Sequence, residues 1–188
     1  TNVFTTAGVC APSRAAHILG MHQIATGTQH MRSSGRPGGG YVAVPPAGVK
    51  AYPELLRTVG YYTYTGSKLD YQFSKHSAGT GPSTIWDSEG GSAPDWRRRE
   101  TAQPFFGFRN FAVTHESGVF RPLGTMPWSF THFIMQIMRW WNLGDAPSEL
   151  VSPADVLVPP YYPDTPVIRA DLARHYNNIT YMDAQVGD

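Results

Sequence analysis

Cys10-Ala11-Pro12-Ser13-Arg14 is the stretch of this 188-residue sequence that says most about its fold. Pro12 and Ser13 favour the start of a helix, which is predicted over residues 13–19 with a glycine ending it. Cys10 is therefore expected just before a helix N-terminus, where backbone N–H groups and the helix dipole favour an anion. Arg14 adds a fixed positive charge one turn along. The sequence thus predicts a site for a thiolate or an oxyanion at Cys10.

Cys10 is the only cysteine of the chain, so an intramolecular disulfide and a cysteine-rich zinc site are both excluded. Taken alone, such a residue is most often a small buried hydrophobic side chain. A phosphotyrosine-type phosphatase is disfavoured, because it needs a longer loop than the three residues that separate Cys10 from Arg14. A cysteine hydrolase would need a histidine close in space. The sequence offers four candidates that it does not rank: His17, His22, His30 and His115.

Helical and strand patterns alternate along the chain, which favours an α/β layer architecture. A helix is predicted over residues 53–59, where proline stands in the first turn and glycine follows. A strand is predicted over 61–65, which is aromatic and β-branched, and a buried strand over 105–113. Apolar residues at helical spacing predict two more helices, over 130–141 and from 166 to the chain's end, the last one opened by an Asp-Thr cap. Both apolar faces are expected to pack in the core.

The composition excludes several classes of protein. Charged residues make up 15% of the chain, below the roughly 25% of an ordinary domain, which argues against a disordered tail or a charged coiled coil. A formal net charge of +1 gives no support for a nucleic-acid partner. The longest apolar stretch, residues 130–141, is too short for a membrane span. Glycine and proline support three predicted loops: 33–48, 76–95 and 142–165.

Residues 10–14 match in full the C-x-P-S-R signature of the type I sulfatases, a family of the alkaline phosphatase-like superfamily, which the chain resembles. Residues 4–6 correspond to the strand and turn that precede the signature, and residues 15–20 to the helix and its glycine, although Leu19 stands where the family usually has threonine. The resemblance covers nearly the whole chain apart from residues 118–150. Further stretches are similar to a polysaccharide-type, heparan N-sulfatase-like subgroup: residues 27–32, 60–63, 68–71, 105–117, 159–166 and 182–187.

The resemblance implies a mechanism. In the family the cysteine is oxidised to formylglycine, an aldehyde that is hydrated to a diol. One hydroxyl, activated by a divalent cation, attacks the sulfur, and the alcohol leaves with the help of a proton donor. The second hydroxyl then expels sulfate and restores the aldehyde. The cation is expected to be Ca²⁺, and the implied maturation partner is a formylglycine-generating or anaerobic sulfatase-maturating enzyme.

The resemblance also assigns roles to single residues. Cys10 would be the precursor of the nucleophile and, once modified, a metal ligand, while Arg14 would hold the diol. Lys68 matches the lysine that contacts the sulfate and the bridging oxygen, and His115 matches the histidine that helps the leaving group depart. Asp70 stands where many sulfatases have histidine, and it could accept a hydrogen bond from the diol. Without the resemblance, Lys68 reads as an exposed charge at a strand end and His115 as a structural histidine.

Substrate contacts are expected in a loop as well as at Lys68. His30 and Arg32 recur in the subgroup, which implies a substrate-facing role, since loops often carry function. The substrate class implied is a sulfated saccharide. Residues 96–99, Trp-Arg-Arg-Arg, read by default as a solvated charged turn, although they could face an anionic sugar chain.

The resemblance makes the 188 residues a partial N-terminal catalytic domain, incomplete at both ends. They are expected to form part of an alkaline phosphatase-like sandwich, with a central, mostly parallel sheet flanked by helices. The strand with the family's metal-binding Asp pair would lie upstream, and the later half of the domain downstream. Calcium takes about six or more oxygen ligands, so we expect these residues alone to bind metal weakly and turn over little or nothing. The family habit is export to the periplasm or outside.

Three alternatives stay open from the sequence. A phosphonate or phosphate monoester hydrolase of the same superfamily would share the signature. A non-catalytic relative would bind sulfated glycans through Arg32, Arg97 and Arg99 and keep that affinity without Cys10. An unrelated α/β domain would carry the signature by chance.

Overall fold

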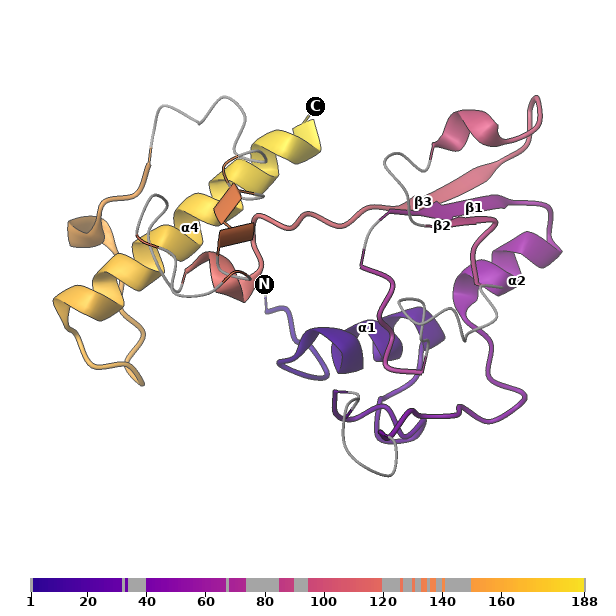
Figure 1. The fold of residues 1–188 in the computed structure, drawn as a ribbon, viewed down its shortest axis with the longest axis horizontal. Helices are drawn as coiled ribbons and strands as arrows, with labels where there is room; N and C mark the ends of the chain where they lie inside the picture. The colour runs from indigo at the N-terminus through magenta and orange to yellow at the C-terminus, as the bar shows by residue number, and fades with distance from the viewer. Residues whose placement is uncertain are drawn as a thin grey trace. The chain divides into compact units, whose positions relative to one another are not determined.

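The computed structural model describes residues 2–31, 33, 40–66, 68–73, 85–89, 95–119 and 150–187, together with residues 126, 130, 133, 134, 136, 137 and 140. They fall into two compact units, Thr1–Asn110 and Phe111–Asp188, which are described separately. Figure 1 labels their helices and strands. Parts of all three predicted loops lie outside the described residues.

The first unit is built around a three-stranded parallel sheet with the strand order β2-β1-β3 (Figure 1). Its strands are β1 (Tyr62–Thr65), β2 (Ser88–Glu89) and β3 (Phe105–Phe108). Both neighbours pair with β1 in parallel, and all four residues of β1 have partners on β3. Thr63 and Thr65 of this central strand are fully buried. The sheet and its helices confirm the α/β class, and β1 confirms the strand predicted over 61–65.

Two helices, α1 (Cys10–Leu19) and α2 (Tyr52–Thr58), belong to the same unit. α1 ends as predicted, because Gly20 takes the left-handed conformation with a φ of +62°. It begins three residues before the predicted residue 13, so Cys10 is the first residue of the helix rather than the residue before it. The reason is that Pro12 lies in the first turn, where its missing N–H breaks no intrahelical hydrogen bond. α2 agrees with its prediction to within one residue at each end.

The core of the first unit is shared by the helices and one face of the sheet, and both helices lie on that side in Figure 1. Phe106 and Phe108 of β3 pack against it and stack on Trp86, with ring centroids 6.1 and 6.2 Å apart. This packing fixes α1 against the sheet. The buried members are Ile18, Leu19, Ala51, Tyr71, Ile85 and Trp86.

β3 corrects the prediction of a buried strand over residues 105–113. The strand ends at Phe108, because its partner β1 has only four residues to pair with it. It is not buried throughout, since its residues alternate between the core and an outer face. On the outer face Phe105 is 44% exposed and stacks on Trp96 of a short 3-10 helix, η2 (Trp96–Arg98).

The segment before α1 is also different from the expectation. Residues 4–6 form no strand, and Phe4 is 88% exposed. Among the described residues no strand lies beside them to supply a ladder, and Thr5 Oγ1 donates instead to the Ala7 carbonyl at 3.0 Å.

The second unit contains a long helix, α4 (Pro166–Gly187), and two 3-10 helices, η3 (Glu116–Gly118) and η4 (Pro153–Asp155). The predicted cap is confirmed, because Thr165 Oγ1 accepts from the Ile168 N–H at 3.3 Å. Both 3-10 helices contact α4.

The predicted core faces of the two later helices are only partly buried where the structure describes them. On α4 the buried residues are Ala173 and Asn178, whereas the apolar Ile179 is 39% exposed and Val186 61% exposed. Of the 130–141 segment, the described residues are helical, yet Phe130 is 77% exposed. Helical spacing defines an apolar face but supplies nothing to cover it. No described helix is both long and apolar enough to cross a membrane.

Candidate functional site

Cys10 heads α1 and is partly buried. The first intrahelical hydrogen bond runs from the Ser13 N–H to the Val9 carbonyl at 3.1 Å. Pro12 has no N–H, so the N–H groups of Cys10 and Ala11 precede the hydrogen-bonded part of the helix. These groups and the helix dipole favour negative charge at this end. The structure therefore supports the predicted anion-favouring environment at Cys10.

Arg14 lies one turn after Cys10 on α1, so the two side chains leave the same face of the helix. Its Nη1 donates to Asn110 Oδ1 at 2.5 Å, and its Nη2 donates to the backbone carbonyl of Lys68. The guanidinium carbon lies 4.9 Å from the ring centroid of Tyr71 and 5.7 Å from that of Phe108. Arg14 is thus the residue that joins α1 to the segments following β1 and β3.

Tyr71 is affected by this arrangement. Burial raises the pKa of its hydroxyl above the ordinary 10.0, while the positive charge of Arg14 acts in the opposite direction. The phenol therefore stays protonated around neutral pH, and it accepts a hydrogen bond from Trp86 Nε1 at 3.3 Å. Tyr71 presents a neutral aromatic face to the guanidinium.

Lys68 and Asp70 lie in the irregular segment that follows the carboxyl end of β1, where Asp70 opens a short turn to Gln72. Lys68 takes a left-handed φ of +67°, and its side chain is exposed. Asp70 Oδ1 accepts from the Gln72 N–H at 2.8 Å, which stabilises the turn. Ligands of parallel sheets gather at this edge. The structure therefore brings the Lys68 segment to Arg14 as a backbone contact, while Asp70 is used within its own turn.

Asn110 is the site residue that the sequence analysis missed. It stands two residues beyond the end of β3, at the same edge of the sheet as Lys68. The predicted strand over 105–113 placed it inside a strand, so nothing singled it out. Had the strand been predicted to end at Phe108, Asn110 would have been recognised as a polar residue just beyond the end of a strand.

His115 belongs to the second unit. It was predicted at the end of a strand, but it lies seven residues beyond Phe108, in the turn that leads into η3. Its N–H donates to the Ala112 carbonyl at 3.0 Å, and its carbonyl accepts from Gly118 at 2.8 Å. The side chain is partly buried. Its role as the group that helps the leaving group depart stays a prediction.

The predicted substrate contacts are only partly described. His30 is exposed, its Nδ1 lies 2.8 Å from the Met31 carbonyl, and its ring lies 4.8 Å from that of Tyr41. Arg32 lies outside the described residues. An exposed ring of this kind is available to a ligand.

Two arginines of the glycan-binding alternative lie on the outer face of the sheet. Arg99 Nε donates to the Gln103 carbonyl at 2.9 Å, and its guanidinium lies 4.7 Å from the Trp96 ring centroid. Arg97 pairs with Asp95 at 3.1 Å, and its side chain is 74% exposed. Arg99 is engaged within its own chain, which weakens this alternative.

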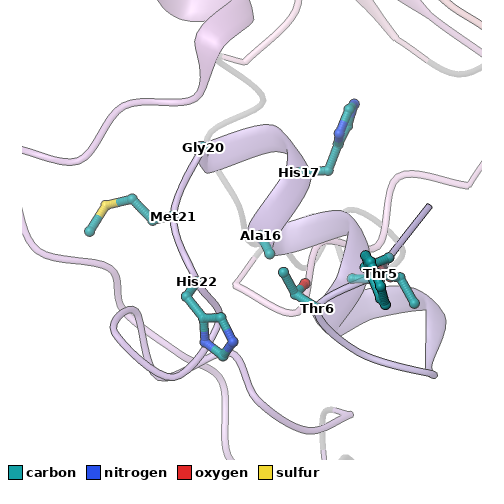
Figure 2. A pocket seen from close by; sticks show the side chains of 9 residues that line it. Thr5, Thr6, Ala16, His17, Gly20, Met21 and His22 are labelled. Carbon is teal, nitrogen blue, oxygen red and sulfur yellow. Dashed lines mark hydrogen bonds between the residues drawn. The ribbon is translucent and has the colours of Figure 1, made fainter. Parts of the chain in front are cut away.

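A pocket of about 330 Å³ lies beside α1, between the segments that enter and leave the helix. Figure 2 shows Thr5 and Thr6 before the helix, His17 on it and His22 after it. Cys10, Arg14 and Lys68 do not line the pocket, so it is separate from their cluster. Its lining residues are Phe4, Thr5, Thr6, Ser13, Ala16, His17, Gly20, Met21 and His22.

The described residues do not fit a cation site. Within the described part of the chain, no three histidine, cysteine, aspartate or glutamate side chains cluster as metal ligands would. Calcium takes about six or more oxygen ligands, and Asp70 already binds its own turn through Oδ1.

Comparison with known proteins gives two relatives that match nearly the whole chain. It is 38% identical over 205 residues to an ulvan-active sulfatase of Formosa agariphila, a match that covers 99% of this chain and 33% of that protein. It is 28% identical over 207 residues to the N-sulphoglucosamine sulphohydrolase of Homo sapiens, covering 99% of this chain and 38% of that protein. The chain thus spans about a third of the length of these curated relatives. No protein-family model matches it.

Proposed function

We propose that this chain is part of a sulfatase, since it matches two sulfatases over nearly its whole length, and that the whole protein removes sulfate from a sulfated carbohydrate. The nucleophile would be a formylglycine derived from Cys10. The 188 residues would supply the nucleophile and part of its surroundings within an alkaline phosphatase-like sandwich. On their own they would turn over little or nothing.

One observation carries the proposal: the complete Cys-x-Pro-Ser-Arg signature lies in the first turns of α1, with Arg14 fixed by residues from the carboxyl edge of the sheet. A helix N-terminus and a guanidinium one turn apart favour a negatively charged group between them. A sulfate ester is such a group. The geometry therefore supports a site for an oxyanion at residue 10.

The chemistry is divided among the chain's own residues. Formylglycine, once formed and hydrated, would carry two hydroxyls: one would attack sulfur while the bond from sulfur to the leaving group breaks, and the other would then expel sulfate and restore the aldehyde. Arg14 offsets negative charge at residue 10, and the exposed ammonium of Lys68 would bind the sulfate oxygens. His115 would protonate the leaving oxygen. Asp70 would accept a hydrogen bond from a hydroxyl of the diol.

The relatives narrow the substrate class. One is named for activity on ulvan and the other for N-sulphoglucosamine, so both names point to sulfated saccharides. We propose the same class here, with His30 and Arg32 as contacts. A maturation enzyme for Cys10, a divalent cation expected to be Ca²⁺, and export to the periplasm or outside belong to the same proposal.

The test uses the full-length protein, produced with a formylglycine-generating enzyme. Sulfated polysaccharides and an aryl sulfate are the substrates, an aryl phosphonate is the comparison, and Cys10→Ala is the matched inactive variant. Sulfate release that is lost in Cys10→Ala is expected. Faster phosphonate hydrolysis would instead favour a phosphonate or phosphate hydrolase. Glycan binding that survives in Cys10→Ala, together with no turnover by the wild-type protein, would favour a non-catalytic relative.

A further inference from the structure

The surroundings of Arg14 form an unusual cradle, made of the Asn110 amide, the Lys68 backbone carbonyl and the rings of Tyr71 and Phe108. The guanidinium is gripped at two nitrogens and stacked against two rings. Its Nε is buried and has no hydrogen-bond partner among the described residues. The cradle therefore orients the guanidinium but does not use all of its hydrogen-bond donors.

The cradle carries no negative charge. Among the residues that the structure describes, no carboxylate pairs with Arg14, and both acceptors are neutral carbonyl oxygens. An aspartate at position 110 would form a stronger, charge-assisted hydrogen bond, yet the chain has an amide there. A neutral acceptor fixes the guanidinium while leaving its full positive charge to act on an anion.

Both acceptors are themselves fixed by the fold. Lys68 turns its backbone into the left-handed region at φ +67°, which places its carbonyl on Arg14 Nη2. Asn110 follows the end of β3, where Thr65 of β1 anchors the Phe108 carbonyl with a hydrogen bond of 3.0 Å. The ends of two neighbouring strands therefore determine where the guanidinium lies.

We propose that Asn110 is a positioning residue for Arg14. Its amide oxygen holds the guanidinium on the Cys10 side of α1 without neutralising it, so that the charge stabilises the oxyanion at residue 10. Asn110 acts through Arg14 and does not touch the substrate. This role rests on the proposed sulfatase function.

The decisive variant is Asn110→Asp in the full-length protein, because it keeps the size and the acceptor oxygen but adds a negative charge. We expect unchanged Cys10 conversion and an unfolding temperature no lower than that of wild type. We also expect kcat/KM on an aryl sulfate to fall about tenfold to hundredfold, as the loss of one interaction with a charged group implies. Inhibition by inorganic sulfate should weaken as well. Asn110→Ala, which releases the guanidinium, should lower kcat and also lower the unfolding temperature.

The matched control is Gln103→Ala, at the opposite end of β3. Its amide donates to the Gly60 carbonyl at 3.0 Å and accepts from the Glu100 N–H at 3.1 Å. We expect kcat/KM to stay near wild type. If Asn110 has only a structural role, Asn110→Asp will be as active as wild type, and that result would overturn the proposal.

A failure of the proposed function is recognised separately, by a wild-type protein with converted Cys10 that cleaves no sulfate ester. The stabilisation of that protein by inorganic sulfate then still tests Asn110. A thermal shift that Asn110→Asp abolishes supports the positioning of Arg14 for an anion, and an equal shift in both proteins contradicts it.

Discussion

Arg14→Lys tests whether the guanidinium fork joins α1 to the sheet. The substitution keeps the positive charge, but one ammonium cannot reach both the Asn110 amide and the Lys68 carbonyl, which two separate nitrogens of Arg14 contact. It also removes the flat group that stacks on Tyr71. The expected result is a lower free energy of unfolding.

The magnitude follows from the contacts. Losing one hydrogen bond from a charged donor costs about 1.5–3 kcal/mol, and losing the cation–π contact costs about 0.5–1 kcal/mol. Removing the Nε, which is buried without a partner among the described residues, recovers about 1 kcal/mol. The net loss is therefore about 1–3 kcal/mol, and exposure of part of the site to solvent places the expected value in the lower half of that range.

Urea unfolding, followed by circular dichroism, measures this loss. The matched control is Arg97→Lys, whose side chain is 74% exposed and pairs with Asp95 on the surface, so a change within about 0.5 kcal/mol is expected. If Arg14→Lys destabilises the protein no more than Arg97→Lys does, the two hydrogen bonds of Arg14 to Asn110 and Lys68 do not stabilise the fold as described.

Two further changes test the fold. Gly107→Ala puts a Cβ into the ring of Tyr64 on the neighbouring strand and should lower the free energy of unfolding by about 1–3 kcal/mol. The control is Gly48→Ala, where nothing lies within 4 Å of the added Cβ, so urea unfolding should show a clearly smaller effect. Equal effects of the two substitutions would contradict the packing of Gly107 against Tyr64. Hydrogen bonds from Arg169 lower the pKa of Asp164 below its ordinary 3.8, so the stability from this pair is present above that value and lost as the pH falls through the lowered pKa. Titration by NMR should show Asp164 returning toward 3.8 in Arg169→Gln, and an unchanged pKa would show that the pair does not form in solution.

Elements with strong local signals were predictable from the sequence. Gly20 ends α1 because a left-handed residue is needed there, and the β-branched and aromatic residues of β1 favour a strand. The end of β3 was not predictable, because it is determined by the length of β1, its partner more than forty residues earlier. The exposure of Phe130 and of Ile179 and Val186 on α4 was also missed, since a helical period does not reveal what packs against it.

The candidate site was likewise predictable only in part. The signature identified Cys10 and Arg14, and their helix places them one turn apart. The contact of Arg14 with Asn110 joins residues 96 positions apart. The left-handed backbone conformation of Lys68 was not predictable either, because the residue is not a glycine. Such contacts depend on the tertiary structure and leave no local pattern.

The most direct test of Cys10 as the precursor of the nucleophile is the mass of the proteolytic peptide that contains it, after expression with a formylglycine-generating enzyme. We expect exchange of the thiol for an aldehyde that reacts with a hydrazide probe. An intact thiol, found while a control sulfatase peptide is converted in the same cells, would contradict the assignment of Cys10 as the precursor of the nucleophile.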